Sequence, residues 1–243
     1  MLFLLPDLSD TAEQLALEEL ILDQIGDSAN PEGCLLLWEQ RETCVVIGLG
    51  NRLHTEVHPD RCRQDGVPIY RRISGGGAVV QGPGCLNYSL VLPIDHAPEL
   101  QSVTSTNQFI MGRISECLTK AEDLEISVRG DTDLVHRDRK VAGNSQKRTR
   151  NTVLFHGTLL LDMDLDLIPR YLPMPSRQPD YRAERGHLDF VSNLPMSMSA
   201  CRNAIRSCWC INDEAPSPSP IEASRVESRA GERYRNPDWT SRI

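Results

Sequence analysis

The spacing of apolar residues along the chain predicts several helices. Over residues 9–25 the apolar side chains recur every three or four positions, and Asp10 and Glu13 stand at the spacing of a capping box. The same spacing predicts further helices over residues 104–121, 165–171, 197–208 and 222–234. These helical segments alternate loosely with segments of strand character.

Short apolar runs predict the strands. They cover residues 34–38, 44–47, 86–92, 133–136, 139–142 and 152–162. The five residues 39–43 suit the loop of a hairpin between the first two runs, and Arg137-Asp138 suits a two-residue hairpin turn. Strands gathered in the middle of the chain, with helices around them, predict an α+β fold with a mixed sheet.

A glycine-rich segment holds the most informative chemistry. From residue 71 to residue 82 it reads Arg-Arg-Ile-Ser-Gly-Gly-Gly-Ala-Val-Val-Gln-Gly. Glycines let backbone N–H groups approach an anion and the arginines add positive charge, so the segment suits a nucleotide or acyl-phosphate cradle. It lacks the spacing of the Walker and dinucleotide loops, because its glycines lead into a strand-like run. A glycine triplet is also typical of a tight turn, and the two arginines favour the cradle.

Lysine is scarce, which draws attention to the positions that keep it. The 26 basic residues comprise 23 arginines and three lysines, Lys120, Lys140 and Lys147. An ammonium group is a compact point charge that a guanidinium does not replace. Lys140 lies in a strand-like run ahead of the small and polar residues 143–145, and it is the candidate for chemistry. We expect Lys147 in a solvated basic loop and Lys120 at the exposed end of a helix.

Composition and charge fit an ordinary globular enzyme. At 243 residues and 40% hydrophobic content the chain can bury a core and supports one domain, with an appendage at most. A net charge of −8 argues against general nucleic-acid binding, and no apolar stretch is long enough to cross a membrane. Eight cysteines in a long chain, with no secretory leader visible, indicate reduced thiols and a cytoplasmic protein. The pairs His54/His58 and Cys208/Cys210 lack further ligands, so we assign no metal site.

Four motifs in order give the chain a family resemblance. They are Arg-Arg-x-Ser-Gly-Gly-Gly-Ala-Val at 71–79, Asp-Leu-Val at 133–135, Arg-Lys-Val-Ala-Gly-x-Ser at 139–145 and His-Gly-Thr-Leu-Leu-Leu at 156–161. At these spacings they resemble the catalytic domain of the lipoate-protein ligase A family, whose superfamily also holds biotin-protein ligases and octanoyltransferases. The resemblance runs from about residue 15 to about residue 194. It implies a mainly antiparallel sheet flanked by helices.

The resemblance implies an enzyme that uses ATP, bound together with Mg²⁺, to activate a fatty acid. Lipoate or octanoate would form acyl-AMP, and a lysine of a lipoyl carrier domain would then take the acyl group. The carrier would be of the glycine cleavage H type or the 2-oxoacid dehydrogenase E2 type, with no nucleic-acid or membrane partner. By resemblance Lys140 is catalytic and lies between the carboxylate and the α-phosphate, where charge develops. The residues implied to bind the acyl-adenylate are Arg72, Ser74, Gly76, Gly77, Ala78, Val79, Val80, Lys140, Gly143, Asn144, Ser145 and His156.

Some of these residues also suit plainer structural roles. Lys140 could protect a strand edge, Ser74 could cap a turn, and His156 could be a hydrogen-bonded core residue. Arg71 could form a structural ion pair. The family pattern favours the catalytic role for Lys140. His156 stays a binding or structural residue, and both roles stay open for Ser74.

The chain beyond the resemblance is short. We expect a catalytic domain over residues 1–212, then a linker over 213–221, where three prolines alternate with small residues. Residues 222–243 would form a C-terminal helix and a tail that docks on the domain and buries Trp239. Many ligases of the family carry an accessory domain, and the residues after 194 are too few to form one. A separate accessory subunit could supply it.

Two other functions stay open. Related octanoyltransferases move an acyl group from a carrier thioester, without ATP, through a cysteine nucleophile. That cysteine falls shortly before the lysine motif, where residues 125–129 hold none. Cys85, beside the glycine-rich segment, is the alternative nucleophile, or else a small buried residue. The loop 81–87 departs from the ligase pattern, which keeps a non-catalytic binder of acyl groups or lipoyl domains as a third alternative. The choice between lipoate and octanoate depends on the length of the acyl tunnel and on whether the packing of its side chains leaves room for a dithiolane ring.

Overall fold

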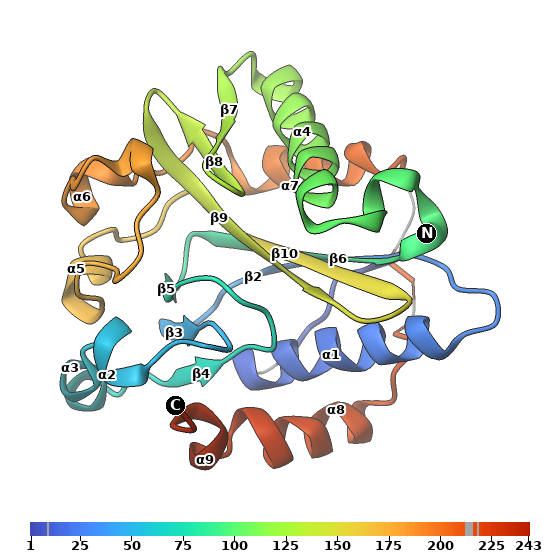
Figure 1. The fold of residues 1–243 in the computed structure, drawn as a ribbon, viewed down its shortest axis with the longest axis horizontal. Coiled ribbons are helices and arrows are strands. Elements are labelled where there is room, and N and C mark those ends of the chain that lie inside the picture. The colour runs from blue at the N-terminus through green and yellow to red at the C-terminus, as the bar shows by residue number, and fades with distance from the viewer. Residues whose placement is uncertain (9, 212–215, 218) are drawn as a thin grey trace.

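A seven-stranded sheet forms the centre of the computed structural model, which describes residues 1–8, 10–211, 216–217 and 219–243 (Figure 1). In spatial order its strands are β1 (Leu2–Leu4), β2 (Cys34–Glu39), β6 (Cys85–Pro93), β10 (Thr152–Leu160), β9 (Arg139–Arg148), β8 (Asp133–His136) and β7 (Ile126–Arg129). Only β1 and β2 pair in parallel within this sheet of described residues, and the other neighbours are antiparallel. The predicted α+β fold with a mixed, mainly antiparallel sheet is therefore confirmed.

A second, three-stranded sheet carries the glycine-rich segment. Its order is β4 (Ile69–Arg71), β3 (Cys44–Ile47) and β5 (Val79–Gln81), with β3 parallel to β4 and antiparallel to β5. The predicted hairpin between residues 34–38 and 44–47 is wrong, because β2 and β3 belong to different sheets. β2 pairs instead along six residues of the long strand β6. That partner lies far away in the sequence, and the spacing of apolar residues does not identify it.

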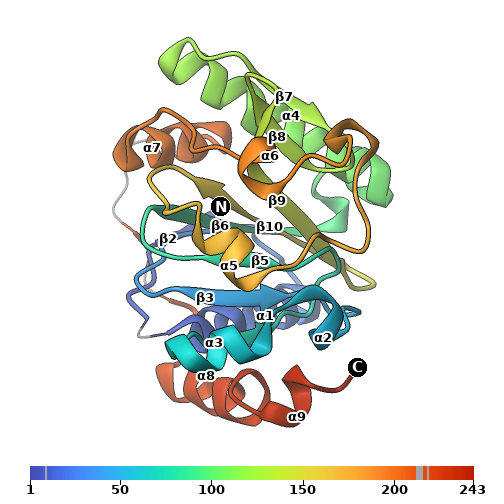
Figure 2. The same cartoon turned by 90° about the vertical axis from the view of Figure 1, so that its left-hand side faces the viewer.

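Helices cover both faces of the large sheet (Figures 1 and 2). α1 (Thr11–Asp27) packs on one face, against β6 and β10, while α4 (Val103–Glu122) and α7 (Met198–Cys208) pack together on the other. The remaining helices are α2 (Leu53–Glu56), α3 (Pro59–Asp65), α5 (Leu167–Tyr171), α6 (His187–Phe190), α8 (Ala223–Arg229) and α9 (Pro237–Thr240), with short turns η1 (Ile94–His96), η2 (Pro98–Gln101), η3 (Asp180–Arg182) and the π-helical turn η4 (Ala230–Tyr234).

The first helix begins where the sequence predicts. The side chain of Asp10 accepts a hydrogen bond of 2.9 Å from the backbone N–H of Glu13, which closes the first turn. Ser9, where the predicted helix began, lies outside the described residues. The predicted helices over 104–121 and 197–208 correspond to α4 and α7.

The hairpin between β8 and β9 confirms the predicted turn at Arg137-Asp138. Both residues have positive φ angles, 47° and 62°, which is the conformation of a type I′ turn. Strand β9 is longer than predicted and continues to Arg148, with Lys147 paired to Leu154 of β10. The expectation of a solvated loop at Lys147 is therefore wrong. Lys120 does face water near the end of α4, where it pairs with Glu116.

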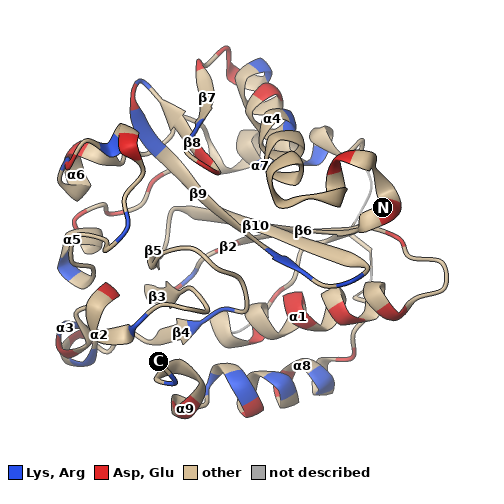
Figure 3. Ribbon diagram, viewed as in Figure 1, with Lys and Arg blue, Asp and Glu red and all other residues tan. Residues whose placement is uncertain are grey.

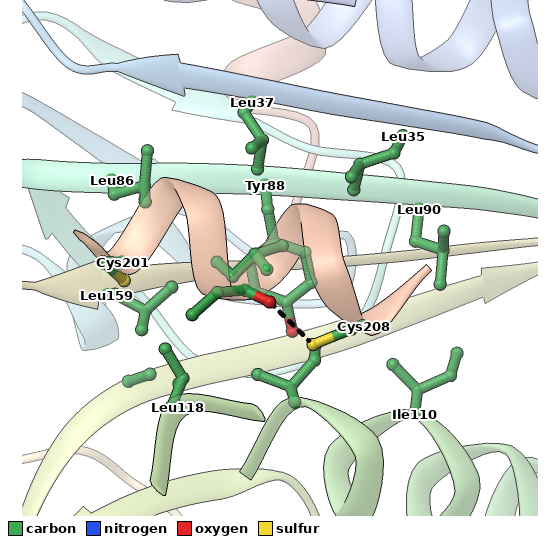
Figure 4. Close-up of a cluster of buried hydrophobic side chains, with 14 of the residues drawn as sticks. Leu35, Leu37, Leu86, Tyr88, Leu90, Ile110, Leu118, Leu159, Cys201 and Cys208 are labelled. Carbon is green, nitrogen blue, oxygen red and sulfur yellow. Dashed lines mark hydrogen bonds between the residues drawn. The ribbon is translucent and has the colours of Figure 1, made fainter. Parts of the chain in front are cut away.

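The core under α4 and α7 is packed with leucines around one tyrosine (Figure 4). Tyr88 of β6 is fully buried, and the labelled side chains around it include Leu37 of β2 and Ile110 of α4. Strand alternation puts Tyr88 on this face, and it puts Asn87 and Ser89 on the face toward α1. This alternation decides which polar side chains can reach the space beneath α1.

The C-terminal segment lies along α1 (Figures 1 and 3). Tyr234 donates a hydrogen bond of 2.9 Å to Glu19 of α1, and Arg229 lies 3.0 Å from the same carboxylate. The indole Nε1 of Trp239 donates to the backbone oxygen of Arg71 at 2.8 Å. Residues 213–215 and 218 of the predicted linker lie outside the described residues, so the predicted domain division stays a prediction.

No helix among the described residues is long and apolar enough to cross a membrane. All eight cysteines are free, and six of them are buried. They lie in β2, β3, α3, β6, α4 and α7, and Cys210 follows the end of α7.

Candidate active site

A pocket of about 130 Å³ lies between α1, the glycine-rich segment and the large sheet. The predicted residues that line it are Arg72, Gly76, Gly77, Ala78, Val79, Lys140, Gly143, Asn144, Ser145 and His156. They come from β9, β10, β5 and the loop between β4 and β5, which include segments that are distant in sequence. The structure thus brings most of the predicted site residues into one place.

A row of paired residues runs across the floor of the pocket. Gly143 of β9 pairs with Thr158 of β10, and Thr158 pairs on its other side with Asn87 of β6. Asn87 in turn pairs with Trp38 of β2. All four residues line the pocket. Three strand spacings separate Gly143 from Trp38, about 14 Å. The pocket is therefore long enough for an extended chain of several carbons.

Lys140 is held at one end of this row. Its Nζ lies 2.7 Å from Asp133 Oδ1 in β8, and a Cβ on Gly143 would come within 3.1 Å of the Lys140 Nζ and Cε. The missing side chain at Gly143 gives the lysine room to fold back over the strand. Asp133 Oδ2 also accepts a 2.7 Å hydrogen bond from the Tyr181 hydroxyl. Burial and the Asp133 charge raise the pKa of Tyr181, so it stays a donor.

The glycine-rich segment presents bare backbone to the pocket. Gly75, Gly76 and Gly77 are exposed, and Gly76 has a φ of +86°, which favours glycine. In the part of the chain that the structure describes, no hydrogen bond engages the backbone N–H groups of Gly76, Gly77 and Ala78. A Cβ on Gly48 would lie 2.1 Å from the backbone oxygen of Gly76. Only glycine at position 48 therefore lets the glycine-rich segment pack this closely. Unpaired N–H groups of this kind suit an anion.

Arg72 hydrogen-bonds to the glycine-rich segment and to β3. Its guanidinium donates to the carbonyls of Gly77 and Val46 at 3.0 and 3.2 Å and to the hydroxyl of Ser74 at 2.9 Å. Burial lowers the pKa of this guanidinium to about 10, which leaves it charged near neutral pH. Arg72 thus adds positive charge beneath the loop while most of its donors are engaged within the protein.

A buried chain of hydrogen bonds links the Arg72 side chain to α1. Ser74 Oγ lies 2.6 Å from His156 Nε2, and His156 Nδ1 lies 3.0 Å from Glu18 Oε2, which is in α1. Ser89 donates to the same carboxylate. The order Ser-His-carboxylate is that of a hydrolase triad, but Ser74 is 1% exposed and is not on the pocket wall. The arrangement can hold the loop in place and offers no accessible hydroxyl.

Asn144 is fixed by its neighbours on β6 and the loop before β8. Tyr88 donates a 2.6 Å hydrogen bond to Asn144 Oδ1, and Asn144 Nδ2 donates to the carbonyl of Thr132 at 2.5 Å. A Cβ on Gly157 would lie 1.7 Å from Asn144 Oδ1, so only glycine leaves room for this amide. Ser145 Oγ donates to the Gly75 carbonyl at 2.9 Å, which ties β9 to the glycine-rich segment.

Three predicted residues lie away from the pocket wall: Ser74, Val80 and Cys85. Val80 points to the opposite side of β5 from Val79 and is buried with Val45 and Ile47, so it does not line the pocket as predicted. Cys85 is fully buried, with its Sγ 3.4 Å from the Met163 Sδ. Burial raises the pKa of the Cys85 thiol to about 11, so it is neither accessible nor ionised near neutral pH.

Sequence reasoning missed several lining residues. They are Thr11, Gln14, Leu15, Glu18, Trp38, Val46, Gln81, Asn87, Tyr88, Gly157 and Thr158. The signal that was present is the alternation of Asn87 and Ser89 with apolar neighbours in β6. Which strand lies beside which depends on long-range pairing, and this pairing decides that Trp38 and Asn87 share one wall.

The family model of the lipoyl protein ligase A/B catalytic domain matches residues 10–200, which is most of the chain. The chain belongs to this family. The matched residues include all four motifs and every residue that lines the pocket.

Two curated relatives extend the comparison. A Schizosaccharomyces pombe protein provisionally named lipoate-protein ligase A is 28% identical over 216 residues, which cover 88% of this chain and 56% of that protein. Lipoate-protein ligase LplJ of Bacillus subtilis is 24% identical over 244 residues, covering 96% of this chain and 71% of that protein. The chain thus spans little more than half the length of the first relative.

Solved structures of the family share the fold. They are protein Ta0514 of Thermoplasma acidophilum with bound lipoic acid, a lipoate-protein ligase A bound with ATP, and a bipartite lipoate protein ligase of T. acidophilum studied with its E2 lipoyl domain. Each matches with a TM-score of 0.79 at 22% sequence identity. The matches cover 99–100% of this chain and 95–98% of those chains.

Proposed function

We propose that this chain catalyses the ATP-dependent attachment of lipoate to a lysine of a lipoyl carrier domain. The observation that carries the proposal is the ammonium of Lys140, held 2.7 Å from Asp133 on a pocket that also presents the free N–H groups of the glycine-rich segment. A cation and several N–H donors around one space suit the phosphate and carboxylate of an acyl-adenylate.

In the first step, a carboxylate oxygen of lipoate attacks the α-phosphorus of ATP. The bond from that phosphorus to the oxygen bridging the β-phosphate breaks, and pyrophosphate leaves with the electron pair. Negative charge concentrates on the α-phosphate oxygens as this happens. Lys140 and the N–H groups of Gly76 and Gly77 would stabilise that charge without moving, because the protein already holds them in position.

In the second step, the amine of the acceptor lysine attacks the acyl carbon. A carbon–nitrogen bond forms, the carbon–oxygen bond to AMP breaks, and the nitrogen gives a proton to water. The pocket contributes position and charge stabilisation, and no covalent intermediate on the protein is needed.

The Mg²⁺ that accompanies ATP would arrive with the triphosphate. Among the described residues no three acidic, histidine or cysteine side chains form a metal cage. Asp133 is the carboxylate at the pocket end, and it already binds Lys140 and Tyr181. This arrangement suits a cation held mainly by substrate phosphates, as Mg²⁺ often is.

One solved structure supports a proposal for the acceptor and for a second subunit. A neighbour of this fold is described as a bipartite ligase with an E2 lipoyl domain, and this chain covers 95% of the matched chain. We therefore propose an E2-type lipoyl domain as acceptor and a separate accessory subunit for adenylation. Eight free cysteines favour a reducing compartment such as the cytoplasm.

A cysteine acyltransferase is the weaker candidate. The lining of the pocket includes no cysteine among the described residues, and Cys85 is buried on the far side of β5 with a raised pKa. A thiol nucleophile would have to be accessible and ionised.

The test is the mass of an apo lipoyl domain after incubation with the protein and one of three acyl donors. The donors are lipoate with Mg-ATP, preformed lipoyl-AMP, and octanoyl-acyl-carrier protein without ATP. We expect a mass gain of one lipoyl group from lipoyl-AMP with this chain alone. Lipoate should give the same gain only when both Mg-ATP and the proposed accessory subunit are present. Lys140→Ala should lower the rate at least 10-fold, because charge-assisted hydrogen bonds are worth about 1.5–3 kcal/mol.

Two variants serve as controls in this assay. Lys147→Ala removes a lysine of the same strand that does not line the pocket, and Cys85→Ser removes the alternative nucleophile. Both should keep the wild-type rate. Transfer from octanoyl-acyl-carrier protein that Cys85→Ser abolishes would contradict the proposal and establish the acyltransferase.

A further inference from the structure

The C-terminal tail, residues 237–243, reaches the base of the glycine-rich segment. Its helix α9 packs against β4, whose last residue, Arg71, is also the first residue of that segment (Figure 1). The indole Nε1 of Trp239 donates to the backbone oxygen of Arg71 at 2.8 Å, across 168 positions of the chain. The tail does not line the pocket. Any effect of the tail on a ligand must therefore pass through the segment.

The peptide unit between Arg71 and Arg72 is held on both sides. Its carbonyl accepts the hydrogen bond from Trp239, and its N–H donates to the backbone oxygen of Ile47 in β3 at 3.0 Å. A peptide unit is planar, so holding its carbonyl and its N–H fixes the orientation of the whole unit. That orientation sets the direction in which the chain leaves β4 toward Gly76.

The guanidinium of Arg71 extends this link to the loop after β3. It donates to five backbone carbonyls, those of Gly48, Leu49, Asn51, Trp239 and Thr240. The Thr240 carbonyl accepts two of these bonds, at 3.0 and 2.6 Å. A guanidinium is a rigid planar fork, so the tail and the loop are held in one fixed arrangement around it.

The loop after β3 in turn supports the glycine-rich segment directly. The backbone N–H of Leu49 donates to the backbone oxygen of Ser74 at 2.8 Å. Gly48 lies so close beneath Gly76 that it has no room for a side chain. Contacts therefore lead without interruption from Trp239 to the part of the segment whose N–H groups face the pocket.

We propose that Trp239 is a positioning residue for the glycine-rich segment, and that the docked tail thereby sets how tightly the pocket binds the phosphate of an acyl-adenylate. The proposal rests on the proposed function for the identity of this ligand. N–H groups stabilise an anion only when they point at it, because a hydrogen bond weakens steeply as its angle departs from linear. A small tilt of the segment would weaken anion binding and leave the fold intact.

Trp239→Phe breaks the link with the least disturbance. The phenyl ring keeps an aromatic face for Arg233 and Arg242, whose guanidinium carbons lie 4.7 and 4.3 Å from the indole ring centroid. The variant removes the N–H that holds the carbonyl of Arg71. It therefore frees one side of the peptide unit while the tail keeps its other contacts.

Tyr234→Phe is the matched control. The Tyr234 hydroxyl donates to Glu19 of α1 at 2.9 Å, so this variant also removes one hydrogen bond of the C-terminal segment. It leaves the contact between Trp239 and Arg71 in place. A tail that only stabilises the protein would make the two variants behave alike, whereas a positioning role affects the pocket in Trp239→Phe alone.

The first experiment is hydrogen exchange of the whole chain without ligand, followed by mass spectrometry of peptides covering residues 48–51 and 71–74. The backbone N–H groups of Leu49 and Arg72 are hydrogen-bonded and should exchange slowly in the wild type. We expect them to exchange about 3-fold to 10-fold faster in Trp239→Phe, as the loss of one hydrogen bond predicts. Tyr234→Phe should exchange at these positions like the wild type.

The second experiment measures binding and turnover. In calorimetric titration, Trp239→Phe should bind a stable phosphate-ester analogue of lipoyl-AMP about 3-fold to 10-fold more weakly than the wild type, and Tyr234→Phe should bind it equally well. In transfer from lipoyl-AMP to an apo lipoyl domain, Trp239→Phe should raise KM by a similar factor and keep kcat within about 2-fold. Loss of folded protein would instead lower kcat and leave KM unchanged. Thermal unfolding checks that both variants are folded.

Faster exchange and weaker binding in Trp239→Phe alone support the proposal. An exchange rate or an affinity in Trp239→Phe that equals the wild type, or an equal loss of affinity in Tyr234→Phe, would overturn it. A wild type that does not bind the analogue, with exchange still faster in Trp239→Phe, would retain the control of the segment by the tail and contradict the proposed function.

Discussion

At the scale of single residues, the account depends on where one ammonium group is held. Lys140 is placed by two features, the carboxylate of Asp133 beside it and the missing side chain of Gly143 beneath it. Asp133 is in turn held by the Tyr181 hydroxyl. We regard Asp133 as a positioning residue for Lys140, because it contacts the lysine and need not contact the substrate.

Asp133→Asn tests this positioning role. The amide keeps the shape of the carboxylate but loses its charge, so the Lys140 ammonium is held less firmly. We expect kcat for lipoyl transfer to fall about 10-fold with little change in KM, which corresponds to a loss of about 1.4 kcal/mol. Tyr181→Phe, which keeps the carboxylate, should lower kcat less than 3-fold. Steady-state kinetics on both variants gives the answer, and an unchanged kcat in Asp133→Asn would exclude the role.

The sequence predicted the central lysine of the site but not its partners. Lys140 was identified because lysine is rare and because it falls in a motif. Tyr181 lies 48 positions from Asp133, in the short turn η3, and nothing in its local sequence predicts the contact. Trp38 and Gln14 reach the pocket only through the order of the strands and the packing of α1. Local sequence carries neither of these.

At the scale of elements, the predicted helix cap and the predicted two-residue turn are confirmed, whereas the predicted pairing of β2 with β3 is wrong. The cap at Asp10 and the turn at Arg137-Asp138 depend on residues within a few positions, and both are confirmed. The hairpin expected between β2 and β3 required a choice of partner, and β6 competes for β2 with a longer register. Lys147 was misplaced for the same reason, because its strand continues beside β10.

Arg71 connects three elements that sequence reasoning treated separately. It is completely buried, and burial lowers the pKa of its guanidinium. The expected ion pair is replaced by hydrogen bonds to five backbone carbonyls, those of Gly48, Leu49, Asn51, Trp239 and Thr240. One side chain at the end of β4 thus joins the loop after β3 to α9.

Arg71→Lys should destabilise the protein by about 2 kcal/mol or more. An ammonium has three donors and no fork, so it leaves several of these carbonyls unpaired. Arg242→Lys is the control, because Arg242 stacks on Trp239 at 4.3 Å and a lysine can keep that contact, so its effect should stay within about 0.5 kcal/mol. Urea unfolding measures both. A stability of Arg71→Lys within 0.5 kcal/mol of wild type would contradict the assigned role.

At the scale of the whole molecule, the pocket lies where independent layers meet. The large sheet supplies its floor, α1 its roof, and the small sheet the glycine-rich segment at its side. The C-terminal segment packs on the outer side of α1 and bonds to Arg71, so the last residues of the chain stabilise the layers around the pocket without lining it (Figure 2). This arrangement leaves the glycine loop open to a ligand.

The central claim is that this pocket binds an acyl-adenylate through Lys140. The most direct measurement is calorimetric titration with a stable phosphate-ester analogue of lipoyl-AMP, which needs neither an acceptor nor an accessory subunit. We predict that the wild type and Lys147→Ala bind the analogue equally and that Lys140→Ala binds it at least 10-fold more weakly, from the loss of a charge-assisted hydrogen bond. Equal affinity of Lys140→Ala and the wild type would contradict the claim.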